Sequence, residues 1–156
     1  MKAVVVVASN RAAAGVYADE TGPLITAWLS EQGFTVDEPV VVPDGDPVGE
    51  AIAAAVAEGA RVVLTTGGTG LTPTDCTPEA TRPLLDREVP GMADAIRAHG
   101  LANGVPTAML SRGLAGVAGS CLVVNLPGSR GGVKDGLAVL GPVLRHAVEQ
   151  IVGSDH

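Results

Sequence analysis

The stretch VVLTTGGTGLTPTDCTPEATRPLL, residues 62–85, joins an apolar run to a glycine-rich loop and then to a helix start. The run RVVLTT at residues 61–66 is short and rich in β-branched residues, which is typical of a buried strand. Thr77 followed by Pro78 is typical of an N-cap and the first residue of a helix. A strand, a small-residue loop and a helix form the repeating unit of α/β proteins, so this stretch indicates the fold class.

The rest of the chain repeats this alternation. Strands are expected at residues 3–8, 34–42, 61–66, 106–113 and 120–128. Further helices are expected to begin at Pro23, at Pro47 after an Asp46 cap, at Pro90 and near residue 133. Pro142 interrupts the last apolar stripe, which predicts a kink or two consecutive helices. The pattern predicts a three-layer α/β/α fold with a mostly parallel sheet, in one domain spanning residues 1–156.

The charge and composition exclude several classes of partner. The net charge is −7 and the chain has only 10 Lys and Arg residues, so nucleic acid is not expected to bind. The apolar run after Lys2 is too short for a signal peptide, and no run approaches a membrane span, so we expect a cytoplasmic protein without membrane contact. Cys76 and Cys121 lie 45 positions apart without a CxxC motif, which is typical of free thiols in a reducing cytosol.

Four loops should meet at one edge of this sheet, because parallel strands all end there and ligands of α/β proteins bind there. They are residues 9–22, 43–47, 67–78 and 127–132. Gly67, Gly68 and Gly70 allow positive φ and a close approach of the main chain, so successive N–H groups could bind an anion. The loop lacks the lysine of a Walker A motif and the third glycine of GxGxxG. The alternative is a tight turn without a ligand.

Two carboxylates, Asp44 and Asp75, each follow an expected strand and should therefore reach the same edge. Carboxylates beside an anion site repel a phosphate unless a divalent cation lies between them, and Mg²⁺ prefers oxygen ligands. This pattern predicts a joint magnesium and substrate site. The alternatives are structural: Asp75 as a helix-start carboxylate, Asp44 as a turn residue and Asp46 as an N-cap.

Ser111 and Arg112 end the segment AMLSR and could place a hydroxyl and a guanidinium fork for phosphate at this edge. The alternatives are a turn hydroxyl and a surface ion pair. Asn125 could donate to a ligand or tie its turn, and the sequence does not separate the two. Cys76 has no histidine near it in sequence and is expected to be a small filler.

Six segments together resemble the MogA/MoaB family of molybdenum cofactor biosynthesis, which includes the gephyrin and plant cofactor-assembly G domains. They are ASNRAAAGVYADETG, TTGGTG, PTDCTPEAT, REVPG, AMLSR and NLPG. The resemblance covers nearly the whole chain. It implies a molybdopterin-binding α/β fold, usually in a trimer, whose catalytic members bind molybdopterin and ATP with Mg²⁺. Those members transfer AMP onto the terminal phosphate of molybdopterin and release pyrophosphate.

The resemblance also implies roles for individual residues. Asp44 and Asp75 match the aspartates tied to catalysis and magnesium. The matching substrate-binding residues are Ser9, Gly67, Gly68, Thr69, Gly70, Ser111, Pro127, Gly128 and Ser129, and Arg112 joins them because of its guanidinium fork. A homotrimer and a downstream molybdenum-insertion protein are the implied partners. Holding the two phosphates in line, rather than activating a side chain, is the expected source of catalysis.

Three positions depart from the family pattern: Asn10 replaces a common Asp, Thr74 a common Arg, and Arg130 a common Pro near the LPG turn. Thr74 leaves more of the phosphate neutralisation to Arg112 and Mg²⁺. The first alternative is therefore a MoaB-type protein that retains or delivers molybdopterin without adenylating it. The second is an α/β nucleotide or phosphate sensor unrelated to molybdenum.

Overall fold

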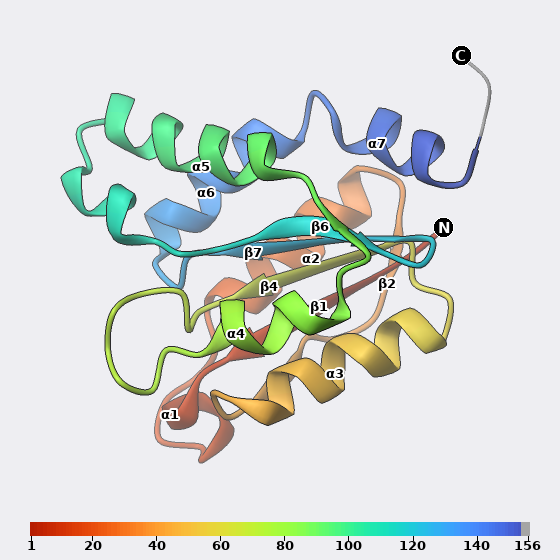
Figure 1. Cartoon of the computed structure of the whole chain (residues 1–156). Helices are drawn as coiled ribbons and strands as arrows, with labels where there is room; N and C mark the ends of the chain where they lie inside the picture. Colours follow the sequence, from red (N-terminus) through yellow and green to blue (C-terminus); the bar gives the residue numbers. More distant parts are fainter. Residues whose placement is uncertain (154–156) are drawn as a thin grey trace.

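In the computed structural model, which describes residues 1–153, seven strands form one sheet between two layers of helices (Figure 1). The strands are β1 (Lys2–Ala8), β2 (Thr35–Val36), β3 (Val40–Val42), β4 (Val62–Thr66), β5 (Arg87–Glu88), β6 (Ala115–Ala118) and β7 (Cys121–Leu126). Their order is β2-β1-β4-β7-β6-β5, and β3 also pairs with β1. The strands β1, β2, β3, β4 and β7 are parallel, whereas β6 runs antiparallel to β7 and the edge strand β5 runs antiparallel to β6. The expected mostly parallel α/β fold is confirmed.

Alternation along the central strands divides the core into two layers. Val5 and Val7 of β1 pack in the cluster that holds buried side chains of α2 (Thr21–Glu31), α5 (Pro90–Ala102), α6 (Arg130–Leu140) and α7 (Leu144–Ile151). Val6 and Ala8 pack in the cluster with α3 (Asp46–Ala57) and α4 (Thr77–Thr81). Because side chains alternate along a strand, one strand contributes to both layers. Each fully buried Val or Leu stabilises the fold by about 1.5–3 kcal/mol.

The helix boundaries differ slightly from those expected. Gly33 and Gly59 follow the ends of α2 and α3 with φ of 92° and 90°, and α6 and α7 are two helices separated around Pro142, as the pattern allowed. A further helix, α1 (Asn10–Ala13), lies in the first loop, where none was expected. The residues at the N-cap positions are Glu20, Gly45 and Cys76, where Pro23 was expected to open the first helix and Asp46 and Thr77 to cap the others.

The prediction of a strand at residues 106–113 was wrong. Residues Pro106–Leu110 form a 3₁₀ helix, η2, and the chain becomes extended as β6 only at Ala115. The reason is pairing: β6 folds back on β7 through the turn at Gly119 (φ 60°), and its register pairs Ala118 with Cys121. The expected strand at residues 34–42 is divided into β2 and β3, on either side of Pro39, and both pieces pair with β1.

The antiparallel direction of β6 positions the site. β1, β3, β4 and β7 all end at one edge, and β6 begins there, preceded by Ser111 and Arg112. These two residues therefore reach the edge at the start of a strand, whereas the sequence placed them at the end of one. Within residues 1–153, no helix is both long and apolar enough to cross a membrane.

Candidate active site

The glycine loop begins where β4 ends. Gly67 and Gly68 have φ of 90° and 68°, as expected, but Gly70 does not have a positive φ. A side chain at Gly67 would clash with the carbonyl oxygen of Ala8, and a Cβ at Gly70 would lie 2.8 Å from Asp75 Oδ2. Gly67 and Gly68 thus allow a backbone conformation that other residues rarely adopt, and Gly70 allows the loop to pack closely against the Asp75 carboxylate.

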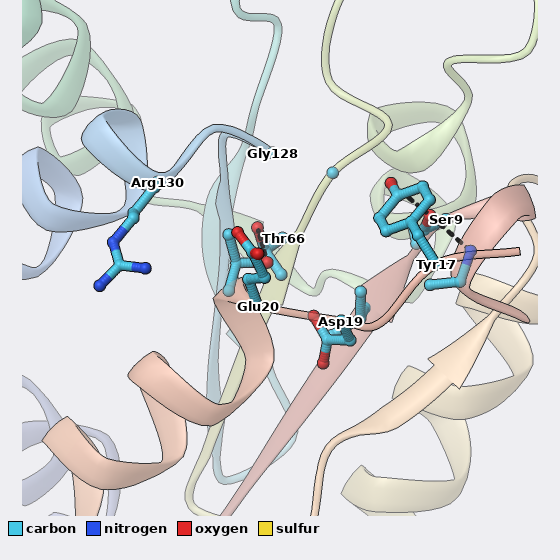
Figure 2. Close-up of a pocket in the computed structure, with 12 residues that line it drawn as sticks. Ser9, Tyr17, Asp19, Glu20, Thr66, Gly128 and Arg130 are labelled. Carbon is cyan, nitrogen blue, oxygen red and sulfur yellow. Dashed lines mark hydrogen bonds between the residues drawn. The ribbon is translucent and has the colours of Figure 1, made fainter. Parts of the chain in front are cut away.

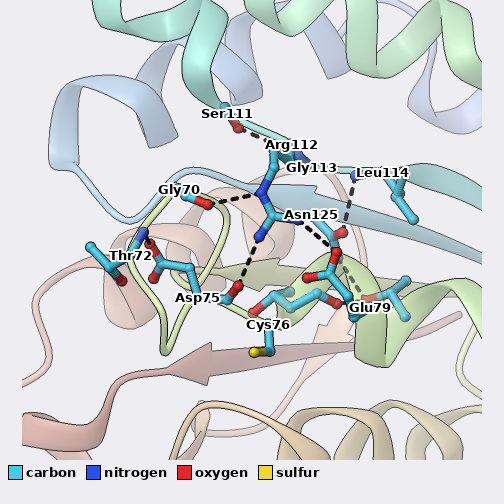
Figure 3. Close-up of polar contacts among 12 residues, drawn as sticks. Gly70, Thr72, Asp75, Cys76, Glu79, Ser111, Arg112, Gly113, Leu114 and Asn125 are labelled. Atoms are coloured by element: carbon cyan, nitrogen blue, oxygen red, sulfur yellow. Dashed lines mark hydrogen bonds and ion pairs between the residues drawn. The ribbon is translucent and has the colours of Figure 1, made fainter.

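The segment Ser111–Arg112, which precedes β6, is hydrogen-bonded to this loop (Figure 3). The Arg112 N–H donates to Thr69 O at 2.8 Å, and Ser111 Oγ donates to Thr69 Oγ1 at 3.3 Å. Arg97 in turn donates to the carbonyl oxygens of Ser111 and Gly113 at 3.2 and 3.1 Å, which holds the segment against α5. The loop is therefore braced along both main chain and side chains.

The Arg112 guanidinium joins both ends of the loop. Its Nε donates to Gly70 O at 2.9 Å, its Nη2 to Asp75 O at 2.7 Å and its Nη1 to Glu79 Oε2 at 2.6 Å. The hydrogen bond from Arg112 lowers the pKa of Glu79. Three of the five guanidinium donors are thus used within the protein. A direct contact between Arg112 and phosphate stays a prediction.

The Asp75 side chain closes a small turn within the loop. Its Oδ2 accepts from the Thr72 N–H at 3.0 Å, and its own N–H donates to Thr72 O at 3.0 Å. Thr74, which stands in this turn where the family commonly has Arg, is exposed. Its hydroxyl lies 3.4 Å from Thr72 Oγ1. The turn therefore fixes the orientation of Asp75 without a basic residue at position 74.

Asp44 lies behind the loop, against Gly68. Its N–H donates to Asn10 Oδ1 at 3.0 Å, so the residue that replaces the usual Asp positions the turn. Its Oδ1 is buried and has no hydrogen-bond partner within the described residues. Burial raises the pKa of Asp44, and the negative charge of Asp75 raises it further. The two carboxylates thus repel each other in the absence of a cation.

These residues fit a magnesium ion held jointly with a substrate. Residues 1–153 contain no cluster of three or more His, Cys, Asp or Glu side chains of the kind that holds a metal alone. Mg²⁺ is usually held by one or two carboxylates together with substrate phosphates. Asp44, with an unpartnered buried oxygen and a raised pKa, and Asp75 are the two carboxylates that would hold the ion.

A cleft of about 580 Å³ opens in front of the loop. Eight of the residues that the sequence assigned to the site line it: Gly68, Thr69, Gly70, Asp75, Ser111, Pro127, Gly128 and Ser129. Arg112 and Asp44 are not among its lining residues; they brace the loop and lie behind it.

A smaller cavity, of about 210 Å³, lies beside this cleft and shares Gly128 with it (Figure 2). The expected site residues Ser9 and Gly67 line it, together with Thr66. Figure 2 shows Tyr17 and Ser9 at one end and Arg130 at the other. The sequence did not identify Tyr17, Asp19, Glu20 or Arg130 as lining residues, although all four lie in loops expected at the sheet edge and the first three belong to the segment ASNRAAAGVYADETG.

Other expected site residues hold the turns in place. Ser9 caps α1, because its Oγ accepts from the Ala12 N–H at 3.1 Å, and it lies 3.2 Å from Tyr17 Oη. Ser129 caps α6 by accepting from the Gly132 N–H at 3.0 Å. Thr66 Oγ1 donates to Pro127 O at 2.7 Å, which fixes the LPG turn.

The structure also separates the alternatives for Asn125 and the cysteines. Asn125 donates to Thr65 and Thr81 and accepts from Leu114, so it ties the turn and is buried away from the cleft. Cys76 and Cys121 are free thiols. Burial raises the pKa of Cys121 to about 12, which keeps it protonated.

The fold and this edge define an α/β protein whose polar cleft, bounded by a glycine loop and two acidic residues, lies at the carboxyl ends of parallel strands. The family described as "Probable molybdopterin binding domain" matches residues 4–146. The chain belongs to this molybdopterin-binding-domain family, and its resemblance to MogA and MoaB is confirmed.

Individual relatives agree with this assignment. The chain is 41% identical over 155 residues to the "Molybdenum cofactor biosynthesis bifunctional protein" of Synechococcus elongatus, covering 99% of this chain and 48% of that protein. It is 41% identical to the "Molybdopterin adenylyltransferase" of Haemophilus influenzae, covering 88% of this chain and 71% of that one. The solved molybdopterin biosynthesis Mog protein from Mycobacterium ulcerans superimposes with a TM-score of 0.92 at 56% identity, covering 96% and 98% of the two chains. The chain thus spans about half the length of the bifunctional relatives it matches.

Proposed function

We propose that this protein transfers AMP from Mg-ATP onto the terminal phosphate of molybdopterin and releases pyrophosphate. The observation that carries the proposal is the convergence of Asp44 and Asp75 on the glycine loop, where Asp44 lies against Gly68 and Asp75 against Gly70. The relative named molybdopterin adenylyltransferase supports it, because this chain covers 71% of that protein.

The two cavities suit the two substrates. The larger cleft, lined by loop residues such as Thr69 and by Ser111, would hold molybdopterin with its phosphate toward the loop. The smaller cavity would hold the nucleotide, with its phosphates toward Arg130 and Gly128 and its base toward Tyr17. Because the cavities meet at Gly128, the reacting phosphates would meet there too.

The reaction needs no side-chain nucleophile. A phosphate oxygen of molybdopterin attacks the α-phosphorus of ATP, a new P–O bond forms, and the bond between the α-phosphorus and the bridging oxygen breaks as pyrophosphate leaves. Magnesium, when bound, would neutralise the phosphate charges that otherwise repel each other. The chain itself positions the reactants: Arg112 holds the loop closed, and Asp44 and Asp75 supply oxygen ligands.

The test is release of pyrophosphate from molybdopterin, ATP and Mg²⁺. Asp75→Asn is the sharpest variant, since the amide oxygen can still accept from the Thr72 N–H while the charge is lost. Its rate should fall at least about a hundredfold, while molybdopterin binding and the unfolding midpoint stay close to those of the wild type. Full activity of Asp75→Asn would refute the assignment of Asp75.

A second candidate function rests on Thr74. Residues 67–78 contain no Lys or Arg, so the loop itself supplies no cation for a triphosphate. A MoaB-type protein that retains or delivers molybdopterin would bind the pterin and release no pyrophosphate. If the wild type behaves in this way and Thr74→Arg gains activity, the second function is the correct one.

The assembly and location are also proposals. Leu71, Met109 and Leu110 are 64%, 61% and 47% exposed, and Leu71 and Leu110 line the cleft, so this apolar group supports an assembly such as the homotrimer that the family implies. Light scattering after gel filtration tests for three copies. A cytoplasmic location is supported by the two free thiols, and delivery to a molybdenum-insertion protein can be tested by transfer of the adenylated product.

A further inference from the structure

Thr77 is an exception among the buried threonines of residues 1–153. It is 0% exposed, yet its hydroxyl has no hydrogen-bond partner. The other buried threonines each have one: Thr65 with Asn125, Thr66 with Pro127, Thr69 with Ser111 and Thr81 with the carbonyl oxygen of Thr77. A buried hydroxyl without a partner costs stability, so one that persists requires an explanation.

The backbone of Thr77 is held firmly in place. Its N–H donates to Gly68 O at 3.0 Å, and its carbonyl oxygen accepts from Thr81 Oγ1 at 2.7 Å. Only the hydroxyl has no hydrogen-bond partner within residues 1–153. Removing the hydroxyl should therefore leave the loop where it is.

A second unpartnered oxygen lies beside this hydroxyl. Asp44 Oδ1 is buried and lacks a partner, and it approaches Gly68 from the β3 side. A Cβ at Gly68 would clash with Thr77 Oγ1 and lie 2.7 Å from Asp44 Oδ1. The two unpartnered oxygens thus both lie against the same glycine, at the place where a side chain would otherwise stand.

Asp44 as a whole is only partly buried, so its second carboxylate oxygen is the one available to a ligand. A hydroxyl that donates to Oδ1 would leave that second oxygen free and fix its direction. We propose that the Thr77 hydroxyl, which has no hydrogen-bond partner within the described residues of the metal-free protein, donates to Asp44 Oδ1 when a divalent cation binds and so orients the carboxylate toward that cation, which makes Thr77 a positioning residue of the site. This inference rests on the cation site of the proposed function and goes beyond it by naming the residue that acts through Asp44.

The test compares Thr77→Val, which removes only the hydroxyl, with Thr77→Ser, which retains it. Binding of Mn²⁺ is followed by electron paramagnetic resonance in the presence of α,β-methylene-ATP, which cannot release pyrophosphate. Thr77→Val should bind Mn²⁺ at least about tenfold more weakly than the wild type, and Thr77→Ser within about twofold. The unfolding midpoint of metal-free Thr77→Val should not fall, because the lost hydroxyl had no partner.

Thr81→Val is the matched control, since it removes a partnered hydroxyl from the same helix. It should lower the unfolding midpoint and leave the Mn²⁺ affinity unchanged. Wild-type affinity for Mn²⁺ in Thr77→Val, equal weakening in Thr77→Ser, or no Mn²⁺ binding by the wild type would each overturn the inference. A wild type that binds Mn²⁺ in this pattern but releases no pyrophosphate would refute AMP transfer alone.

Discussion

Gly67 and Gly128 contact each other backbone to backbone: a Cβ on Gly128 would lie 3.2 Å from Gly67 Cα. The contact joins the glycine loop after β4 to the LPG turn after β7, and the hydrogen bond from Gly67 N to Leu126 O at 3.2 Å runs beside it. Gly128 lines both cavities, so this contact lies where the two cavities meet. A side chain at Gly67 would clash with Ala8 O, and one at Gly128 would press against Gly67.

Gly67→Ala should therefore lower the free energy of unfolding by about 2–4 kcal/mol, since it adds a clash with Ala8 O to the cost of a positive φ. Gly15→Ala is the control, because Gly15 has φ of 74° but no atom near its Cβ position. Gly15→Ala should lower the free energy of unfolding by about 1–2 kcal/mol, because it adds only the cost of a positive φ and no clash. Urea unfolding measures both, and equal losses would contradict the packing role of Gly67.

Asp44 predicts a pH dependence of stability in the absence of metal. Its pKa is raised above the ordinary value of 3.8 in the folded protein, chiefly by burial and then by the Asp75 charge. The contribution of Asp44 to the free energy of unfolding is therefore fully present below pH 3.8, and it is lost as the pH rises through the folded-state pKa. In EDTA, Asp44→Asn should be more stable than the wild type at pH 7, and the difference should shrink toward pH 4. A variant less stable at pH 7 would contradict this sign.

Arg112→Lys keeps the charge but loses the fork that bonds Gly70, Asp75 and Glu79. We expect the free energy of unfolding to fall by about 1–2 kcal/mol and the molybdopterin Kd to rise about tenfold. The control is Arg82→Lys, whose ion pair with Glu88 is exposed at 60% and 43%. That change should cost less than about 0.5 kcal/mol, as exposed pairs usually do. Chemical unfolding and a binding titration check both values.

Tyr17 is 53% exposed and lines the smaller cavity, so its ring is available to an adenine base. Tyr17→Ala should raise the KM for ATP about tenfold, since stacking of a base on an aromatic ring contributes about 1–3 kcal/mol. Tyr17→Phe keeps the ring and loses only the contact with Ser9, so its KM should stay within about threefold. An unchanged KM for ATP in Tyr17→Ala would place the base elsewhere.

Local features made much of the fold predictable. The apolar runs at residues 3–8 and 61–66, the glycines after α2 and α3, and the break at Pro142 each express a backbone preference over a few residues. Asp44 and Asp75 could be assigned to one edge because parallel strands end together. The segment at residues 106–113 could not be assigned correctly, since β6 is defined by pairing with β7 and not by its own composition.

The sequence by itself determined the alternation of strands and helices, the glycine-rich loop and the acidic residues beside it, because each depends on neighbours along the chain. Only the tertiary structure decided that Arg112 uses three donors on that loop and the helix after it, that Tyr17 reaches a cavity, and that the Thr77 hydroxyl has no partner within residues 1–153. These relationships join residues that are distant in the chain. Their geometry is set by how the sheet and its two helix layers pack, which no local pattern encodes.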